Sequence, residues 1–256
     1  MRQVTALIGK EFLALKRTGK LWIFIILFFL FGIMNPAVAK LTPWMMEMMA
    51  ESFSETGLVV ESVEVSALTS WMQFYKNIPI ALIVFLLLFS SILTEEYQKG
   101  TLIQMVTKGA KRWKMIGAKY MTMAVFWTFG YLVMFAVTYG YNEYFWDNST
   151  VSHVVLSAMG CYITGMWLIS LIIFWSAVFS TSSFVLLAAG GVFFLCYLAG
   201  MIPELHSYLP LYLMETSDLL IKGGKFSEYV PSLLLTAGWS VVNLAGSVFC
   251  FNRKRL

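Results

Sequence analysis

Charged side chains are scarce in this sequence, and their scarcity excludes an ordinary water-soluble protein. Asp, Glu, Lys and Arg make up only 12% of the 256 residues, whereas soluble domains average about 25%. Hydrophobic residues make up 59% of the chain, and the mean hydropathy is +0.75. A chain with so few charges is expected to have lipid rather than water as its main solvent.

Cysteine and histidine are also rare, which argues against metal and nucleophilic chemistry. The three cysteines, Cys161, Cys196 and Cys250, have no metal-ligand or redox spacing, so we expect small apolar core residues. The two histidines, His153 and His206, form no His-x-x-x-His or Cys-His arrangement. No G-x-x-x-x-G-K-[ST] phosphate-binding loop occurs in the sequence. The chain therefore has no ATPase motif, and we expect no catalytic residue, no metal site and no cofactor of its own.

The charges that are present leave five long uncharged runs between them, one of them interrupted only by His153. A helix needs roughly 20 apolar residues to cross a bilayer core about 30 Å thick. Four runs fit one crossing each, and the fifth fits two, with Ser180 to Ser183 as the turn. FIILFFLFGI is apolar on every face, unlike the alternating strands of a membrane barrel. The sequence predicts an all-α integral membrane protein with six transmembrane helices, at residues 21–39, 77–94, 115–140, 152–178, 182–202 and 230–251.

The basic residues are divided unevenly between the two sides of such a bundle. One side holds both termini and residues 95–119, with 14 of the 18 Lys and Arg residues and only three of the 14 acidic residues. Basic loops stay in the cytoplasm, so we expect a multi-pass plasma-membrane protein with both termini inside. The membrane accounts for the basic patch, and no nucleic-acid motif is present, so no nucleic-acid partner is expected.

The first twenty residues have the pattern of an interfacial helix. Five apolar residues follow helical spacing there: Val4, Leu7, Ile8, Phe12 and Leu15. Lys10 and Glu11 are expected to lie away from this apolar stripe. The pattern predicts an amphipathic helix on the cytoplasmic surface of the membrane.

Two long segments are expected on the outer side. Residues 40–76 contain an aromatic and methionine cluster made of Trp44, Met45, Met46, Met48 and Met49. It fits either a solvated helical hairpin packed on neighbouring spans or an external cap whose flexible thioethers contact an apolar cargo. Residues 203–229 hold short apolar stretches broken by Pro210 and Gly223-Gly224, a pattern typical of re-entrant or interfacial helices.

The segment between the second and third spans contains the stretch TEEYQKGTLIQMV. Thr94 is expected to cap a short helix with Glu95 and Glu96 in its first turn. Gly100 permits a sharp break, and Thr101 is expected to cap a second short helix. The result would be a rigid helix-turn-helix projecting into the cytoplasm. The alternative is an ordinary loop held at the headgroups by its lysines.

The order of these features resembles the type-2 ABC exporter permeases. The shared features are an interfacial helix with Lys-Glu, six spans, Glu-x-x-x-Gly-Thr after the second span, a basic run to Lys119, and broken outer helices before the last span. The resemblance implies that residues 95–114 form a coupling segment that docks on a separate ATP-binding subunit, which would hold ATP and Mg²⁺. The coupling residues that it implies are Glu95, Glu96, Gly100, Thr101, Leu102 and Met105. It also implies a second permease subunit, as a homodimer in a 2+2 complex surrounded by membrane lipid.

The resemblance, together with walls rich in aromatic residues and methionine, favours export of an amphipathic or apolar peptide, as in bacterial peptide exporters. Export of drugs or lipids by the same architecture is the alternative. A secondary carrier or channel is a further alternative, but it would hold ionisable groups in mid-span, and the two halves show no repeat. Residues 40–76 are longer than the outer loop of many such permeases, so the cargo does not follow from the resemblance.

Overall fold

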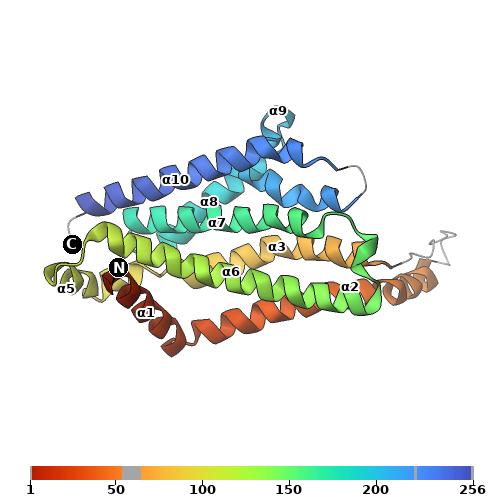
Figure 1. Cartoon of the computed structure of the whole chain (residues 1–256), viewed down its shortest axis with the longest axis horizontal. Helices are drawn as coiled ribbons and strands as arrows, with labels where there is room; N and C mark the ends of the chain where they lie inside the picture. Colours follow the sequence, from red (N-terminus) through yellow and green to blue (C-terminus); the bar gives the residue numbers. More distant parts are fainter. Residues whose placement is uncertain (1, 54–64, 222–223, 255–256) are drawn as a thin grey trace.

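The computed structural model describes residues 2–53, 65–221 and 224–254, which form an elongated bundle of helices (Figure 1). These described residues contain no strand, and six of their helices are long and apolar enough to cross a membrane. The prediction of an all-α membrane protein is therefore confirmed. The six long helices are α2 (Lys20–Phe53), α3 (Ala67–Phe89), α6 (Arg112–Phe145), α7 (Val154–Val178), α8 (Ser182–Ala199) and α10 (Val230–Arg253).

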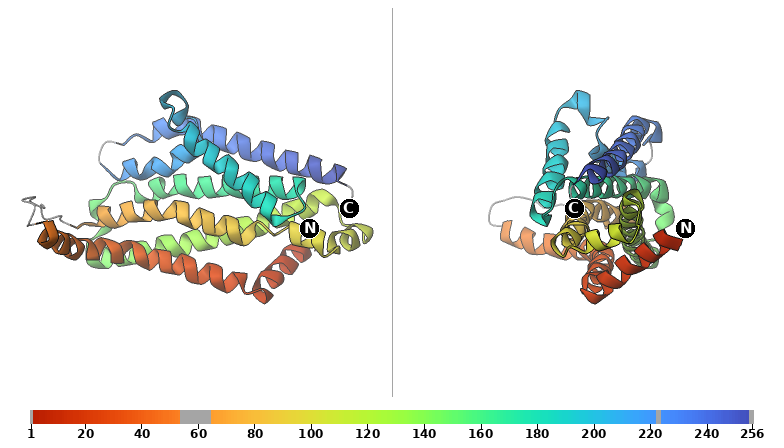
Figure 2. Two further views of the ribbon diagram at one scale, coloured as in Figure 1. Left: turned by 180° about the vertical axis from the view of Figure 1, so that it is seen from behind. Right: turned by 90° about the vertical axis from the view of Figure 1, so that its left-hand side faces the viewer.

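Shorter elements join the long helices. On one side lie α1 (Arg2–Arg17), α4 (Thr94–Gln98) and α5 (Thr101–Thr107). The other connections contain α9 (Pro203–His206) and three 3₁₀ helices, which are η2 (Asn148–Thr150), η3 (Pro210–Leu220) and η4 (Phe226–Tyr229). The start of α1, the end of α10 and the α4–α5 segment lie at one end of the bundle, and the far ends of α2 and α6 lie at the other (Figures 1 and 2).

Helix α2 is longer than the sequence predicts. It was expected to end at residue 39, but it continues past Lys40 and Pro43 to Phe53. Proline at position 36 removes the N–H that would bond to the Gly32 carbonyl, and the Thr138 hydroxyl of α6 donates to that carbonyl instead, at 3.1 Å. The first part of the expected outer segment is thus an extension of the first span. Residues 54–64 lie outside the described part of the chain.

The other helices differ from the expected spans mainly at their ends. Helix α3 begins at Ala67, ten residues before the expected start, and α6 runs from Arg112 to Phe145 rather than over 115–140. The ends of α7, α8 and α10 fall within about three residues of the expected positions. The extra turns of α3 and α6 contain polar and basic side chains, and hydropathy alone therefore left these turns out of the predicted spans. The predicted turn between the fourth and fifth spans is confirmed, because α8 begins at Ser182 with Thr181 as its N-cap.

The centre of the bundle is an aromatic core shared by α2, α3, α6 and α7. Phe28 of α2 and Phe85 of α3 pack edge to face on the Trp127 indole of α6, with ring centroids 5.9 and 5.5 Å apart. Gly165 of α7 faces the same indole, and a Cβ there would overlap it. Cys161 and Cys196 are buried, as expected for core residues, whereas Cys250 is partly buried. Helix α8 crosses the bundle obliquely (Figure 2) and buries only Val185, Ala189 and Cys196.

The outer segment before the last span is broken into short helices, as predicted. Pro210 begins η3, and Gly223 lies outside the described residues. Two reciprocal hydrogen bonds hold η3 on α7: the Thr216 hydroxyl donates to the Ser157 carbonyl at 2.7 Å, and the Ser157 hydroxyl donates to the Thr216 carbonyl at 2.5 Å. The close approach is possible because Gly160 has no Cβ to meet the Leu213 carbonyl.

Candidate functional site

The α4–α5 segment is a helix-turn-helix, but its helices are not capped as the sequence predicts. Thr94 is the first residue of α4 rather than its N-cap, which is Leu93. No cap is needed, because the Glu95 and Glu96 amides already donate to carbonyls of the preceding turn, at 3.0 and 3.2 Å. Thr101 likewise begins α5, and the residue before it, Gly100, takes a left-handed conformation with φ 65°. The predicted break at Gly100 is therefore confirmed.

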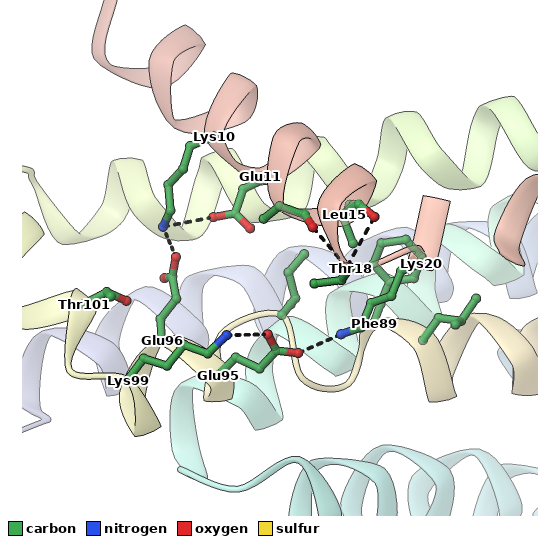
Figure 3. Close-up of a pocket in the computed structure, with 13 residues that line it drawn as sticks. Lys10, Glu11, Leu15, Thr18, Lys20, Phe89, Glu95, Glu96, Lys99 and Thr101 are labelled. Carbon is green, nitrogen blue, oxygen red and sulfur yellow. Dashed lines mark hydrogen bonds and ion pairs between the residues drawn. The ribbon is translucent and has the colours of Figure 1, made fainter. Parts of the chain in front are cut away.

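Glu96, on the inner face of α4, belongs to a group of four charged residues that we call the buried charge cluster. The four residues are Lys10, Glu11, Glu96 and Lys119. Lys119 Nζ lies 2.9 Å from Glu11 Oε1 and 3.1 Å from Glu96 Oε2. Lys10 donates to the other oxygen of Glu96 (Figure 3). Glu11, Glu96 and Lys119 are all buried. The cluster joins α1, α4 and α6 with balanced charge.

The position of Glu11 corrects the expected orientation of α1. Glu11 was expected away from the apolar stripe, but it is only 7% exposed, whereas Phe12 of the predicted stripe is 48% exposed. A carboxylate is buried at such a cost only when a cation neutralises it. Lys119 supplies that cation from a segment 108 residues away, so the sequence of α1 alone gives no signal for it.

A second set of ion pairs holds Glu95, at the edge of the same region. Lys20 Nζ and Ser91 Oγ each lie 2.7 Å from Glu95 Oε1, and Lys99 Nζ lies 3.4 Å from Oε2. Glu95 is partly exposed. A cavity of about 170 Å³ lies between α1, the end of α3 and α4 (Figure 3). The charged residues that border it are Lys10, Glu11, Lys20, Glu95, Glu96 and Lys99. Leu15, Phe89 and Ile92 form part of its apolar lining.

The opposite side of α4 contacts the end of α10. The Lys254 ammonium lies 4.1 Å from the Tyr97 ring centroid and donates to the Val178 carbonyl at 3.0 Å. Burial lowers the pKa of Lys254 below its ordinary value. Arg112 donates to the Phe251 and Lys254 carbonyls at 2.7 and 2.9 Å, so the start of α6 caps the end of α10. Helix α4 is thus held by α1, α6 and α10 together.

The expected coupling residues lie mostly on the inner face of the segment. Glu96 and Leu102 are buried, and Glu95, Gly100, Thr101 and Met105 are partly buried. The surface that faces away from the bundle, which we call the outer face of the segment, consists of Gln98, Lys99, Ile103, Gln104, Thr107 and Lys108. None of these six residues was among the predicted coupling residues. The spacing of Leu102, Met105 and Val106 was the available signal, because it assigns one face of α5 to the bundle.

The methionine cluster lies on the outer extension of α2. Trp44, Met45 and Met48 are between 52 and 57% exposed, and Met46 is partly buried. The Met49 side chain lies outside the described residues. Three members of the predicted cargo-contacting cap are therefore open to the surroundings of the protein.

The two histidines lie outside these clusters. His206 Nε2 is 2.9 Å from Glu215 Oε1, and its ring packs on Tyr212 with centroids 4.9 Å apart. His153 immediately precedes α7. Within the described part of the chain, no group of three or more His, Cys, Asp or Glu side chains is placed to hold a metal ion.

The bundle defines a multi-span membrane protein with a structured helix-turn-helix at the end that holds both chain ends. Residues 5–256 match the family described as ABC-2 family transporter protein. Since this match covers nearly the whole sequence, the chain belongs to the ABC-2 transporter family, whose members are membrane subunits of ABC transporters. No individual curated protein matches the sequence.

Proposed function

We propose that this chain is the permease subunit of an ATP-driven exporter, and that the α4–α5 segment is its contact with a separate ATP-binding subunit. The observation that carries the proposal is a short helix-turn-helix that α1 and α6 hold on one side of α4 and the end of α10 holds on the other, and that leaves an outer face open. A rigid projecting element transmits a push into the bundle, which a loose loop would absorb. The partner would bind ATP and Mg²⁺, since this sequence has no phosphate-binding loop.

The charge distribution supports an orientation in the plasma membrane. The end of the bundle with the α4–α5 segment also holds α1 and the end of α10 (Figure 1). The segments that the sequence assigns to this side contain 14 of the 18 basic residues, and basic segments stay in the cytoplasm. Both termini and the outer face of the segment would then be accessible to a cytoplasmic ATPase.

Two copies of the chain would form the transport pathway in a 2+2 complex. Helix α8 packs least on its own bundle, and an apolar groove of about 360 Å³ lies between it and helices α3 and α7. Gly190 and Gly191 lie on the same helix, with Leu86 3.7 Å from a Cβ at the first and open space beside the second. Small residues allow close helix approach in lipid. These features support a homodimer that meets through α8.

The cargo that fits these surfaces is an amphipathic or apolar peptide. The groove beside α8 is lined by Leu82, Leu86, Phe193, Phe194 and Tyr197 among others, and its walls are almost entirely apolar. Trp44, Met45 and Met48 present further adaptable apolar surface at the outer end. The same surfaces would accept an apolar drug or a lipid, which is the second candidate cargo class.

Co-purification tests the ATPase partnership. The chain is co-expressed in turn with each ATP-binding cassette protein of its own genome and is isolated in mild detergent. We expect one such protein to co-purify in equal amount with the wild type and with Tyr144→Asp, a change at an 81% exposed site at the far end of α6. Ile103→Asp, at a 49% exposed site on the outer face of the segment, should lose it while the chain still inserts. Unreduced co-purification with Ile103→Asp, or no partner for the wild type, would contradict the proposal.

The cargo class is tested on the purified complex in nanodiscs by ATPase stimulation. Amphipathic peptides should stimulate hydrolysis at lower concentrations than drugs or free lipids. Stimulation by drugs or lipids alone would overturn the peptide assignment and leave the permease assignment unaffected.

A further inference from the structure

Lys119 is a buried lysine inside a membrane-spanning helix. It lies about two turns into α6, and it is 2% exposed. An ammonium group has three N–H donors. Its Nζ donates hydrogen bonds to Glu11 Oε1 at 2.9 Å and to the Ile92 carbonyl at 2.6 Å, and it forms an ion pair with Glu96 Oε2 at 3.1 Å. These three oxygen acceptors surround a buried cation, so the position of the lysine and the positions of the three oxygens depend on one another.

The three acceptors of Lys119 lie on three segments other than α6. Glu11 lies on α1, Ile92 lies in the turn after α3, and Glu96 lies on α4. Lys10 of α1 bonds to Glu96 as well, so α1 contacts α4 both directly and through Lys119. If Lys119 lost its charge, two carboxylates would remain buried with only the partly exposed Lys10 beside them.

We propose that Lys119 is a positioning residue that locks α1, α4 and α5 into one rigid body. The proposal rests on the proposed function for its role in transport: a push on the outer face of the segment would move α1 together with α4. Because only Thr18 and Gly19 separate the end of α1 from the start of α2, this motion reaches the first span directly. Apolar residues of similar volume would pack this site at lower electrostatic cost, but they would not fix a single relative geometry of the three segments.

The charges that face Lys119 come from every element packed around it. They are Glu11 and Lys10 from α1 and Glu96 from α4, while Lys20 and Glu95 form the adjacent pair. The cluster itself is neutral, with two cations and two anions. Removing Lys119 leaves a net negative buried site, whereas removing a lysine on the surface of α6 does not. Lys114, which is partly exposed and bonds to Gln3 at 3.0 Å, is the matched control.

The test measures the distance between α1 and α5 in the chain alone, in nanodiscs, by double electron–electron resonance. Spin labels are placed at the exposed positions of Lys16 and Thr107, in a variant whose three native cysteines are replaced by alanine. A second pair of labels at Val155 and Val242, on α7 and α10, reports on the rest of the bundle. Lys119→Met, Glu11→Gln and the control Lys114→Met are compared with this parent.

We expect one narrow Lys16–Thr107 distance in the parent and in Lys114→Met. Lys119→Met should add a second, longer Lys16–Thr107 distance. Glu11→Gln keeps the Lys119–Glu96 pair and replaces Lys119→Met in the comparison where that variant does not fold. It should add the same longer distance. The Val155–Val242 distance should not change. A single unchanged Lys16–Thr107 distance in Lys119→Met, or in Glu11→Gln where that variant replaces it, would overturn the proposal. Equal broadening of both label pairs would also overturn it, because the residue would then support the whole fold. The measurement needs no ATP-binding subunit, so it fails or succeeds independently of the co-purification test.

Discussion

Lys20, the first residue of α2, forms an ion pair with Glu95 of α4, with 2.7 Å between Nζ and Oε1. The two side chains are 25 and 36% exposed. Water and salt therefore reach this pair, in contrast to Lys119 and its two glutamates. The first span is thus tied directly to the α4–α5 segment by a solvent-accessible contact, whereas the buried charge cluster ties that segment to α1 and α6.

Replacing Lys20 by methionine should have only a small effect on stability. An exposed pair of this kind contributes about 0.2–1 kcal/mol, and 1 kcal/mol corresponds to about 2–4 °C in a chain of this size. The difference from wild type, measured as the unfolding midpoint in detergent, should shrink at high salt because exposed charges are screened. Lys16→Met, at an exposed site on α1, is the control. A fall in the unfolding midpoint as large as that caused by a core substitution would show that the Lys20–Glu95 pair is not screened by solvent.

Replacing Gly100 by alanine should weaken binding of the ATP-binding subunit. Gly100 has φ 65°, and nothing lies within 4 Å of a Cβ built there. The cost is therefore one of backbone conformation, about 1–2 kcal/mol for an L-residue in the left-handed region. We expect the α4–α5 segment to change its orientation to relieve this backbone strain. Its affinity for the ATP-binding subunit should then fall about tenfold, which corresponds to 1.4 kcal/mol.

Titration of the permease in nanodiscs with the ATP-binding subunit measures this change. Gly100→Asn should lose less affinity than Gly100→Ala, because asparagine enters the left-handed region more readily. Gly9→Ala, at a helical glycine with open space around it, should bind normally. Equal affinity of Gly100→Ala and wild type would show that the turn at Gly100 does not set the docking geometry.

Replacing Gly165 by alanine should destabilise the bundle. The added methyl group would overlap the Trp127 indole, which is fully buried between α6 and α7. Overpacking of this kind typically costs about 1–3 kcal/mol. The unfolding midpoint should fall, and the double variant Gly165→Ala with Trp127→Phe should recover part of the loss because the smaller ring leaves room.

Gly238→Ala, on α10, is the matched control for the Gly165 experiment. It also adds one methyl group to a glycine in a membrane helix, but no atom lies within 4 Å of that position. Its unfolding midpoint should equal that of wild type. An equal loss in both variants would mean that helix flexibility, rather than the contact with Trp127, makes glycine necessary at position 165.

Much of the fold could be predicted because the uncharged runs directly reflect the thickness of a bilayer. The full length of α2 could not. The uncharged run ends before Lys40, but the helix continues past this residue to Phe53. Pro36 lies inside the helix without ending it, because the Thr138 hydroxyl of α6 donates to the Gly32 carbonyl in place of the missing N–H. That compensation is a tertiary contact between residues 106 positions apart, which no local pattern contains.

The candidate site shows the same division between local and tertiary information. The break at Gly100 was predictable because the tolerance of glycine for a left-handed backbone conformation is a property of that residue alone. The burial of Glu11 was not, because a charged residue on an amphipathic helix is ordinarily placed toward water. Only its pairing with Lys119 of α6 makes the inward position stable. Whether Glu96 or Ile103 faces outward likewise depends on the packing of α4 and α5 against the bundle.

The proposed homodimer leads to a cross-linking prediction on α8. Leu187 and Phe194 lie seven residues apart, and therefore on one face of the helix, and they are 71 and 58% exposed. In a two-fold interface, residues near the axis meet their own copies. If α8 lies near the axis, Leu187→Cys and Phe194→Cys should each give a covalent dimer with a short bismaleimide in native membranes, in a background free of other cysteines.

A cysteine on α10 separates a specific interface from random collision in the membrane. Leu235 is 51% exposed on α10, so Leu235→Cys presents a thiol to the same lipid with comparable access. It should remain monomeric while the two α8 variants cross-link, because the two α10 helices would face away from each other. Cross-linking through Leu235→Cys alone would move the interface to α10. Equal cross-linking at all three positions would indicate collision, and the apolar face of α8 would then be covered by lipid.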